Sequence, residues 1–465
     1  MIKLVTLFSW VLYFSAAHAS NAMDFDKSTN NVRKLTSTLI EQNTTNPPGN
    51  EAKAVETLTA LLKKAGISYH IDEFAPGRKS LVARLPGSST GLKPLLLLAH
   101  LDVVGTENQD WTTAPHKLTE KEGYLYGRGV IDDLSMAAAS VEILVLLKKY
   151  NTPLKRDVIL ALTGDEESGG AGLSSLLKKH PEWVQAGIVL NEGGSPLLDK
   201  NGRVSMVRYQ VAEKTQQDYI LKANSKGGHS ARPSQDNAIV RLAKALKNIS
   251  EIQHPRKLQP VMKNFFEEKA KNEESRFAKL FRKIAASTGL IDEEDFKLLN
   301  DRPGIAASLT TTCTPTLISG GTRANVLPSE ASATVNCRIV PDENPEVVLK
   351  RLQEATKNQD IEVTLGPSMD GNSNISPTEG EGPAAIRKIA GEMWPGVPVV
   401  AGSQLGMTDA RRYRALGVPA YGINPFPLNE SDLVRTHGAD ERMPVSSLRT
   451  GVEFYYRLVK ELSSH

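Results

Sequence analysis

The clearest indication of the fold is the stretch DVILALTGDEESGG, at residues 157–170. It opens with an apolar run of strand length, which is typical of a strand buried on both faces of a sheet. It continues with three consecutive acids, Asp165, Glu166 and Glu167. Adjacent carboxylates repel one another, and burial raises the free-energy cost of ionising them. We therefore expect a source of positive charge where this strand ends.

Similar apolar runs lie on both sides of this stretch. LLLLAHLDVV (95–104) comes before it and GIVLNEGG (187–194) comes after it. Amphipathic segments such as MAAASVEILVLLKKY (136–150) separate the runs. Short apolar runs that alternate with helical patterns predict an α/β domain, built on a mixed sheet with helices on both faces.

The pattern changes near residue 213. When residues 255–305 are set aside, the order of predicted elements up to residue 370 is βαββαβ. This order is typical of a compact two-layer, ferredoxin-like module. The α/β pattern resumes after residue 370, so the sequence predicts one domain inserted into another. The predicted parts are a catalytic domain at 20–212 and 371–465, and an inserted lid domain at 213–370.

Residues 255–305 are charged and helical in pattern. We expect them to form a solvated helical insertion that packs on the lid module. A gate over the functional site is the alternative.

The first 19 residues have the pattern of a secretory signal peptide. A basic start at Lys3 is followed by the apolar core LVTLFSWVLYFSAA and by a small-x-small cleavage site, Ala17-His18-Ala19. The apolar core is too short for a spanning helix, and no cysteine follows it. We therefore expect a periplasmic or secreted protein without a membrane anchor after cleavage; a buried N-terminal helix is the alternative.

Overall charge argues against nucleic acid as the main partner. Lys and Arg number 56 and Asp and Glu 53, which gives a formal net charge of +3. Nucleic-acid binding normally requires a concentrated basic face. The two cysteines, Cys313 and Cys337, lie in strand-like runs on either side of a turn. A cross-strand disulfide and two buried thiols both fit this placement.

Histidines and acids follow the strands of the first domain in several places. Because the carboxyl ends of strands in an open α/β sheet form the ligand crevice, these side chains are expected to converge there. Each acid alone could be a helix N-cap or a loop residue, and Asp133 could be a cap or a surface acid. Together they predict a site for a pair of divalent cations. The residues are His100, Asp102, Asp132, Glu166, Glu167, Glu192 and His437.

With these motifs in view, the sequence resembles the co-catalytic zinc family of carboxypeptidase S, aminoacylase, glutamate carboxypeptidase and succinyl-diaminopimelate desuccinylase. The resemblance extends over residues 30–460 and is nearest to carboxypeptidase S. It departs from many relatives at Leu134-Ser135, where they have Lys-Gly; neither position is a ligand. The matching motifs are AHLDVV, YGRGVIDD, TGDEESGG, VLNEGG, GGHSARP, RANVLP and THGADERM, in family order.

The resemblance implies two zinc ions, with cobalt or manganese as substitutes. One ion would be held by His100 and Glu192 and the other by Glu167 and His437. Asp132 would bridge both ions. Two further side chains would assist the reaction: Asp102 would hydrogen-bond to the imidazole of His100, and Glu166 would act as general base and acid.

The resemblance also implies contacts to the substrate from the lid domain and a nearby loop. His229 would stabilise the oxyanion, often from a partner subunit. Arg338 would bind a substrate carboxylate, although a solvent-facing arginine is the alternative. Asn325 and Gly406 match positions that contact the oxyanion or the carboxylate.

The predicted function is hydrolysis of an amide bond next to a free carboxylate, in a small peptide or an N-acyl amino acid. A strict N-acyl-amino-acid aminoacylase is the alternative within enzymes. A metal-binding relative without turnover is the alternative from another class. The family further implies a homodimer formed through the inserted domain.

Overall fold

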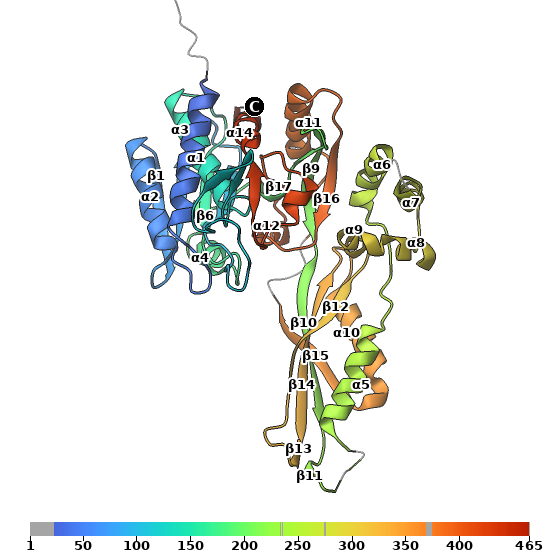
Figure 1. The fold of residues 1–465 in the computed structure, drawn as a ribbon. Helices are drawn as coiled ribbons and strands as arrows, with labels where there is room; N and C mark the ends of the chain where they lie inside the picture. Colours follow the sequence, from blue (N-terminus) through green and yellow to red (C-terminus); the bar gives the residue numbers. More distant parts are fainter. Residues whose placement is uncertain (1–22, 233, 235, 274–275, 369–373, 465) are drawn as a thin grey trace, which may run out of the picture.

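The computed structural model describes residues 23–232, 234, 236–273, 276–368 and 374–464. The signal peptide predicted at residues 1–19 lies outside this range. The described chain is organised around a large sheet and a smaller one that extends away from it (Figure 1). Within the described residues, no helix combines the length and apolar character needed to cross a membrane.

The large sheet has nine strands in the order β1-β2-β6-β3-β7-β17-β9-β16, with β8 pairing with β9. Strands β6, β3, β7 and β17 are parallel to one another, whereas β1, β2 and the β17–β9 pair are antiparallel, so the sheet is mixed. The strands are β1 (Ser68–Ala75), β2 (Arg78–Leu85), β3 (Leu95–His100), β6 (Val158–Thr163), β7 (Ile188–Gly194), β8 (Pro196–Leu198), β9 (Val204–Glu213), β16 (Val399–Gln404) and β17 (Ala420–Ile423).

Helices cover both faces of this sheet. In β3, Leu95 and Leu97 belong to one hydrophobic core, and Leu96 and Leu98 belong to the core on the other face. This two-sided burial explains the uninterrupted apolar runs and confirms the predicted fold class. The first core includes α1 (Phe25–Glu41), α2 (Glu51–Lys64), α3 (Leu134–Lys149), α11 (Glu381–Met393) and α14 (Val445–Ser464), and the second includes α4 (Ala171–Lys179) and α12 (Ala410–Ala415).

The smaller sheet forms the inserted module. Its four antiparallel strands have the order β12-β14-β10-β15, and α5 and α10 pack on one face. Along β10 and β14, buried and partly exposed residues alternate, as expected for a sheet covered on one side. The chain therefore follows the predicted βαββαβ order. The elements are β10 (Thr215–Asn224), α5 (Ala238–Ser250), β12 (Thr312–Gly320), β14 (Glu330–Ile339), α10 (Pro345–Thr356) and β15 (Ile361–Ser368).

The two cysteines form a disulfide in this module. Cys313 of β12 lies directly opposite Cys337 of β14 in the antiparallel register. Of the two arrangements that fit the sequence, the structure contains the cross-strand disulfide.

The helical insertion packs differently from our expectation. Its apolar side chains, including Phe266 and Phe281, form a core with Met206 of β9 and Val400 of β16. Among the described residues, the apolar core of the insertion therefore lies against the edge of the large sheet, and no lid strand or helix contributes to this core (Figure 1). The reason is that β16 is the edge strand and offers an apolar surface to the insertion. The insertion contains α6 (Lys263–Asn272), α7 (Arg276–Ala285), α8 (Glu293–Lys297) and α9 (Pro303–Ser308).

Candidate metal centre and catalytic site

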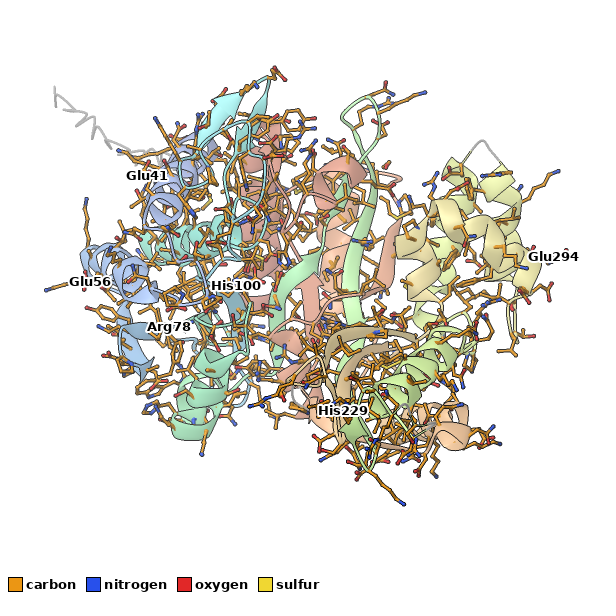
Figure 2. The ribbon with its side chains drawn as sticks, turned by 60° about the horizontal axis from the view of Figure 1, so that its bottom comes forward. Glu41, Glu56, Arg78, His100, His229 and Glu294 are labelled. Atoms are coloured by element: carbon orange, nitrogen blue, oxygen red, sulfur yellow. A yellow bond between two sulfur atoms is a disulfide. The ribbon has the colours of Figure 1, made fainter. Side chains whose placement is uncertain are left out.

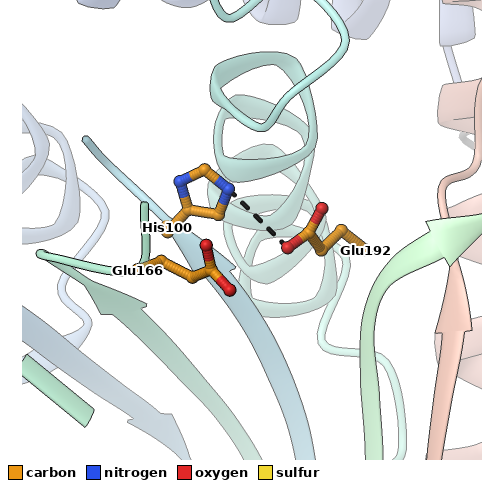
Figure 3. A group of neighbouring side chains, drawn as sticks. All are labelled: His100, Glu166 and Glu192. Carbon is orange, nitrogen blue, oxygen red and sulfur yellow. Dashed lines mark ion pairs between the residues drawn. The ribbon is translucent and has the colours of Figure 1, made fainter. Parts of the chain in front are cut away.

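Predicted ligands lie where neighbouring parallel strands of the large sheet end. His100 is the last residue of β3, Glu166 follows β6, and Glu192 lies near the end of β7. Figure 3 shows these three side chains pointing toward one another, with an ion pair between His100 and Glu192. The sheet topology therefore brings together residues that are far apart in the sequence.

Asp132 lies between the two histidines. Its Oδ1 is 2.9 Å from Nε2 of His100, and its Oδ2 is 3.1 Å from Nε2 of His437. On the outer sides, Glu192 Oε1 is 3.7 Å from the His100 nitrogen and Glu167 Oε2 is 3.2 Å from the His437 nitrogen. Each histidine thus has its own glutamate, and the two share one aspartate. This is the arrangement that a bridging carboxylate requires.

The donor set fits divalent cations. The ligand atoms of His100, Asp132 and Glu167 lie within 4.8 Å of one another, as do those of His100, Glu166 and Glu192. Oε1 of Glu167 is buried and has no hydrogen-bond partner, although such atoms normally have one. Imidazole nitrogens combined with carboxylate oxygens suit zinc, and also cobalt or manganese.

The charges in the centre favour bound protons when no cation is present. Burial, and then the neighbouring acids, raise the pKa of Glu166 and of Glu192 well above the usual range, although His100 opposes this shift. Hydrogen bonds to Asp132 and Glu167 raise the pKa of His437 to about 10. A cation needs neutral histidines and ionised carboxylates as ligands, so it must displace the protons held by Glu192 and His437.

We accordingly expect zinc binding to the metal-free protein to release protons near neutral pH. The sign follows from the raised pKa values, because groups that still hold protons at this pH lose them to the cation. Titration calorimetry in buffers of different ionisation enthalpy measures the release, and zinc affinity should fall as the pH is lowered. Substituting His437→Ala should reduce the number of protons released. An observed enthalpy that is the same in every buffer would contradict this prediction.

Asp102 has a different contact from the one expected. The Nδ1 atom of His100 is 2.9 Å from the backbone carbonyl of Asp102 and 3.8 Å from its carboxylate, so the carbonyl is the hydrogen-bond partner. The carboxylate instead accepts from the backbone N–H groups of Glu166 and Glu167, each at 3.1 Å. Asp102 therefore fixes the turn that carries the predicted base. Burial raises the pKa of Asp102 to about 6.

A polar network that the sequence did not reveal supports the same turn. Asn46 Nδ2 donates to Asp102 at 2.8 Å and to Asp165 at 3.1 Å. Arg78 donates to Asp165 at 3.1 Å and makes two bonds of 2.7 Å to the buried Glu51. The positive charge expected beside the three acids is therefore supplied to Asp165 by Arg78. No local pattern marks Asn46, Glu51 or Arg78, because their partners are distant in sequence.

Asp133 is neither a surface acid nor a side-chain cap. It is fully buried at the start of α3, makes no side-chain capping bond, and its Oδ2 accepts from the backbone N–H of His100 at 3.3 Å. The surface reading is wrong, whereas Asp133 does occupy the N-cap position of α3 without a capping bond from its side chain. The carboxylate thus contacts the backbone of the predicted ligand His100, and burial raises the pKa of Asp133 well above the usual range.

Predicted substrate residues of the lid lie away from this centre. His229 is exposed in β11 (Gly228–His229), at the tip of the lid, and Figure 2 shows it separated from His100. Asn325 is also exposed beside this strand, and its carbonyl accepts from the N–H of Ser230 at 3.1 Å. Within one chain, neither residue reaches the metal centre.

Two other predicted substrate residues lie closer to the junction of the two parts. Arg338 is half-buried in β14, opposite Gln216 of β10, and burial lowers the pKa of its guanidinium. It is therefore not simply a solvent-facing residue. Gly406 lies exposed in the turn before α12, with open space where a side chain would begin.

The mixed sheet, the inserted lid and the cluster of histidines and acids define a hydrolytic metalloenzyme. Residues 96–461 match the family described as Peptidase family M20/M25/M40, and the chain belongs to this family. This finding confirms the resemblance seen in the sequence motifs and the prediction of a hydrolytic enzyme.

Three relatives show which activities occur among similar chains. The N-fatty-acyl-amino acid synthase/hydrolase of Xenopus tropicalis is 29% identical over 83% of this chain and 75% of its own. A probable carboxypeptidase S-like protein of Dictyostelium discoideum is 27% identical over 83% and 75%. Human aminoacylase-1 is 25% identical over 90% and 92%.

A solved structure has the same fold. The M20 family metallo-carboxypeptidase of Sulfolobus solfataricus superposes with a TM-score of 0.71 and 18% identity, over 95% of this chain and 99% of that chain.

Proposed function

We propose that this protein is a secreted or periplasmic hydrolase that uses two zinc ions to cleave an amide bond next to a free carboxylate. Its substrate would be a small peptide or an N-acyl amino acid. The observation that carries the proposal is the position of Asp132, with one carboxylate oxygen at His100 and the other at His437. A carboxylate that faces two histidines in this way can bridge two cations that lie side by side.

His100 and Glu192 would hold one zinc ion, and Glu167 and His437 the other. When bound, two zinc ions polarise the substrate carbonyl and make a water molecule acidic enough to attack near neutral pH. The protein supplies the geometry for both functions. The carbonyl of Asp102 fixes the ring of His100, and the carboxylate of Asp102 fixes the turn after β6.

Glu166 would move the proton during the reaction. Its carboxylate lies within 4.8 Å of the ligand atoms of His100 and Glu192, and burial raises its pKa well above the usual range. It would accept a proton from the attacking water as the new C–O bond forms. It would then give that proton to the nitrogen as the C–N bond breaks.

Arg338 would bind the substrate carboxylate with its planar guanidinium, near the turn of Gly406. His229 and Asn325 would stabilise the oxyanion. Because both lie at the tip of the lid, we propose that a partner subunit supplies them in a homodimer.

The substrate class can be tested with one panel. We expect hydrolysis of N-acyl amino acids or dipeptides that have a free carboxylate, and little hydrolysis of the same compounds with that carboxylate amidated. Activity on acyl amino acids alone would favour the strict aminoacylase, an activity type found among the relatives. Two bound zinc ions without turnover of any compound would favour the non-catalytic alternative and overturn the proposal.

The export prediction has its own test. The sequence pattern of residues 1–19 supports it, and mass spectrometry of the mature protein should find Ser20 at the N-terminus. A mature chain that begins at Met1 would contradict it.

Exposed apolar residues on the edge of the lid support the homodimer. Leu317 and Ile318 are 68% and 66% exposed, and both lie on β12, which is an edge strand. Replacing both with lysine should convert a dimer into monomers, as measured by size exclusion with light scattering. Activity should fall with the dimer, while bound zinc is unchanged. Leu416→Lys, at a 65% exposed leucine of the catalytic part, is the matched control. A fully active wild-type monomer would contradict this prediction.

A further inference from the structure

A buried ion pair joins the two loops that carry Asp132 and His437. The guanidinium of Arg128 and the carboxylate of Glu441 are 2.7 Å apart, and the two side chains are 1% and 0% exposed. Neither residue is among the predicted metal ligands. Both nevertheless make several hydrogen bonds to the backbone around those ligands.

Glu441 holds the turn that leads to Asp132. Its Oε1 accepts from the backbone N–H of Ile131 at 2.8 Å and of Asp132 at 3.1 Å. Its Oε2 accepts from the N–H of Gly129 at 3.1 Å and from Arg128. One carboxylate therefore accepts hydrogen bonds from three backbone N–H groups of this turn. These bonds fix the backbone from which the side chain of Asp132 extends.

Arg128 holds the loop of His437. Its Nη2 donates to the backbone carbonyls of His437 at 3.2 Å and Gly438 at 3.1 Å, and to Gln109 Oε1 at 2.8 Å. Gln109 in turn donates to the same His437 carbonyl at 2.8 Å. The guanidinium also lies 5.1 Å from the centre of the Trp111 ring.

These contacts matter because they fix the backbone of His437, whereas the ring itself contacts only the acids Asp132 and Glu167 within the described residues. Its side chain is 52% exposed, and its backbone is in the left-handed region, at φ 65°. The residue lies 305 positions from Asp132 in the sequence. A direct link between the two loops is therefore needed to keep both side chains around one cation.

We propose that Arg128 and Glu441 are positioning residues for the cation that Asp132, Glu167 and His437 would share. The inference deepens the proposed function, because it rests on that cation site. Buried ion pairs contribute little net stability compared with apolar groups of similar volume. The role of this pair is to hold the two ligand loops in fixed positions relative to each other, through its directional hydrogen bonds.

Four variants test this inference, and one of them, Arg128→Met alone, leaves Glu441 buried without its partner. Arg128→Lys keeps the charge but loses the fork that reaches Glu441 and both carbonyls together. The double variant Arg128→Met/Glu441→Gln removes both charges, so neither is left buried without a partner. Arg442→Met is the matched control, because Arg442 pairs with Asp432 at 3.0 Å in the adjacent position without contacting either ligand loop.

Hydrogen exchange of the metal-free proteins measures how firmly the backbone of the two loops is held. We expect faster exchange in peptides covering 129–133 and 435–440 for Arg128→Lys and for the double variant, and unchanged exchange there for Arg442→Met. Thermal melting should show the double variant closer to wild type than Arg128→Met alone. Zinc titration should show one of two binding steps weakened about 10- to 100-fold in the two loop variants.

The inference is overturned if folded Arg128→Lys and double variants exchange and bind two zinc ions like wild type. It is also overturned if Arg442→Met causes the same loss, since the effect would then be one of general stability. Failure of the proposed function has a different signature. In that case wild-type protein shows no hydrolysis, while the exchange and zinc measurements still report whether the pair positions the loops.

Discussion

Glu166→Gln should lower kcat by a factor of about 10²–10⁴ and leave two zinc ions bound. Glutamine has nearly the same volume as glutamate but cannot accept and return a proton. In the proposed reaction, Glu166 performs both transfers and binds neither cation. The loss should therefore appear mainly in kcat, with little change in KM and in metal content, as measured by steady-state kinetics and elemental analysis.

A second substitution distinguishes the proposed role of Glu166 as a base from the role of a metal ligand. Glu192→Gln removes a carboxylate that is 3.7 Å from Nε2 of His100, so it should lower zinc affinity as well as activity. Glu182→Gln, at an exposed acid after α4, is the control for surface charge and should change neither. Unchanged turnover in Glu166→Gln would refute the role of the base. Loss of a zinc ion from that variant would make Glu166 a ligand instead.

Much of the fold follows from the sequence because the central strands are buried on both faces. Burial on two sides selects uninterrupted apolar runs, and such runs can be recognised without knowing their neighbours. The lid can be recognised from a different feature of the sequence. Its strands and helices follow one another in a simple βαββαβ order. The helical insertion was misplaced because its apolar residues show that it needs a partner surface, but do not show which surface.

The metal centre was also predictable in part. His100, Glu166 and Glu192 each come directly at or near the end of an apolar run, so their convergence follows from the topology of the sheet. The supporting residues have no such signal. Arg78 and Glu441 act on segments that are 87 and about 310 positions away, and only the folded chain shows these pairings.

His229 differs from the predicted metal ligands in its position in the fold. The motif placed this residue correctly in the inserted part of the chain, in β11. A single sequence cannot state which copy of the metal centre a residue serves. The structure favours the metal centre of another subunit, because His229 is exposed at the tip of the lid and lies away from His100 of its own chain (Figure 2).

A mixture of two inactive variants should therefore recover activity. His229→Ala removes the proposed oxyanion donor, and we expect it to lower kcat by about 10²–10³-fold. Glu166→Gln is inactive for a separate reason. In a dimer formed from one chain of each, one site combines the intact Glu166 of the first chain with the intact His229 of the second.

Random reassociation of equal amounts should give about a quarter of the wild-type activity, because half of the dimers are mixed and each has one complete site. Mixing either variant with itself is the control and should recover nothing. The recovery should disappear when Leu317 and Ile318 are replaced with lysine in both chains, because the exposed edge of β12 is the proposed contact. If the mixture stays inactive although mixed dimers are detected, then His229 serves the centre of its own chain. The lid must in that case close onto its own catalytic domain to bring the histidine there.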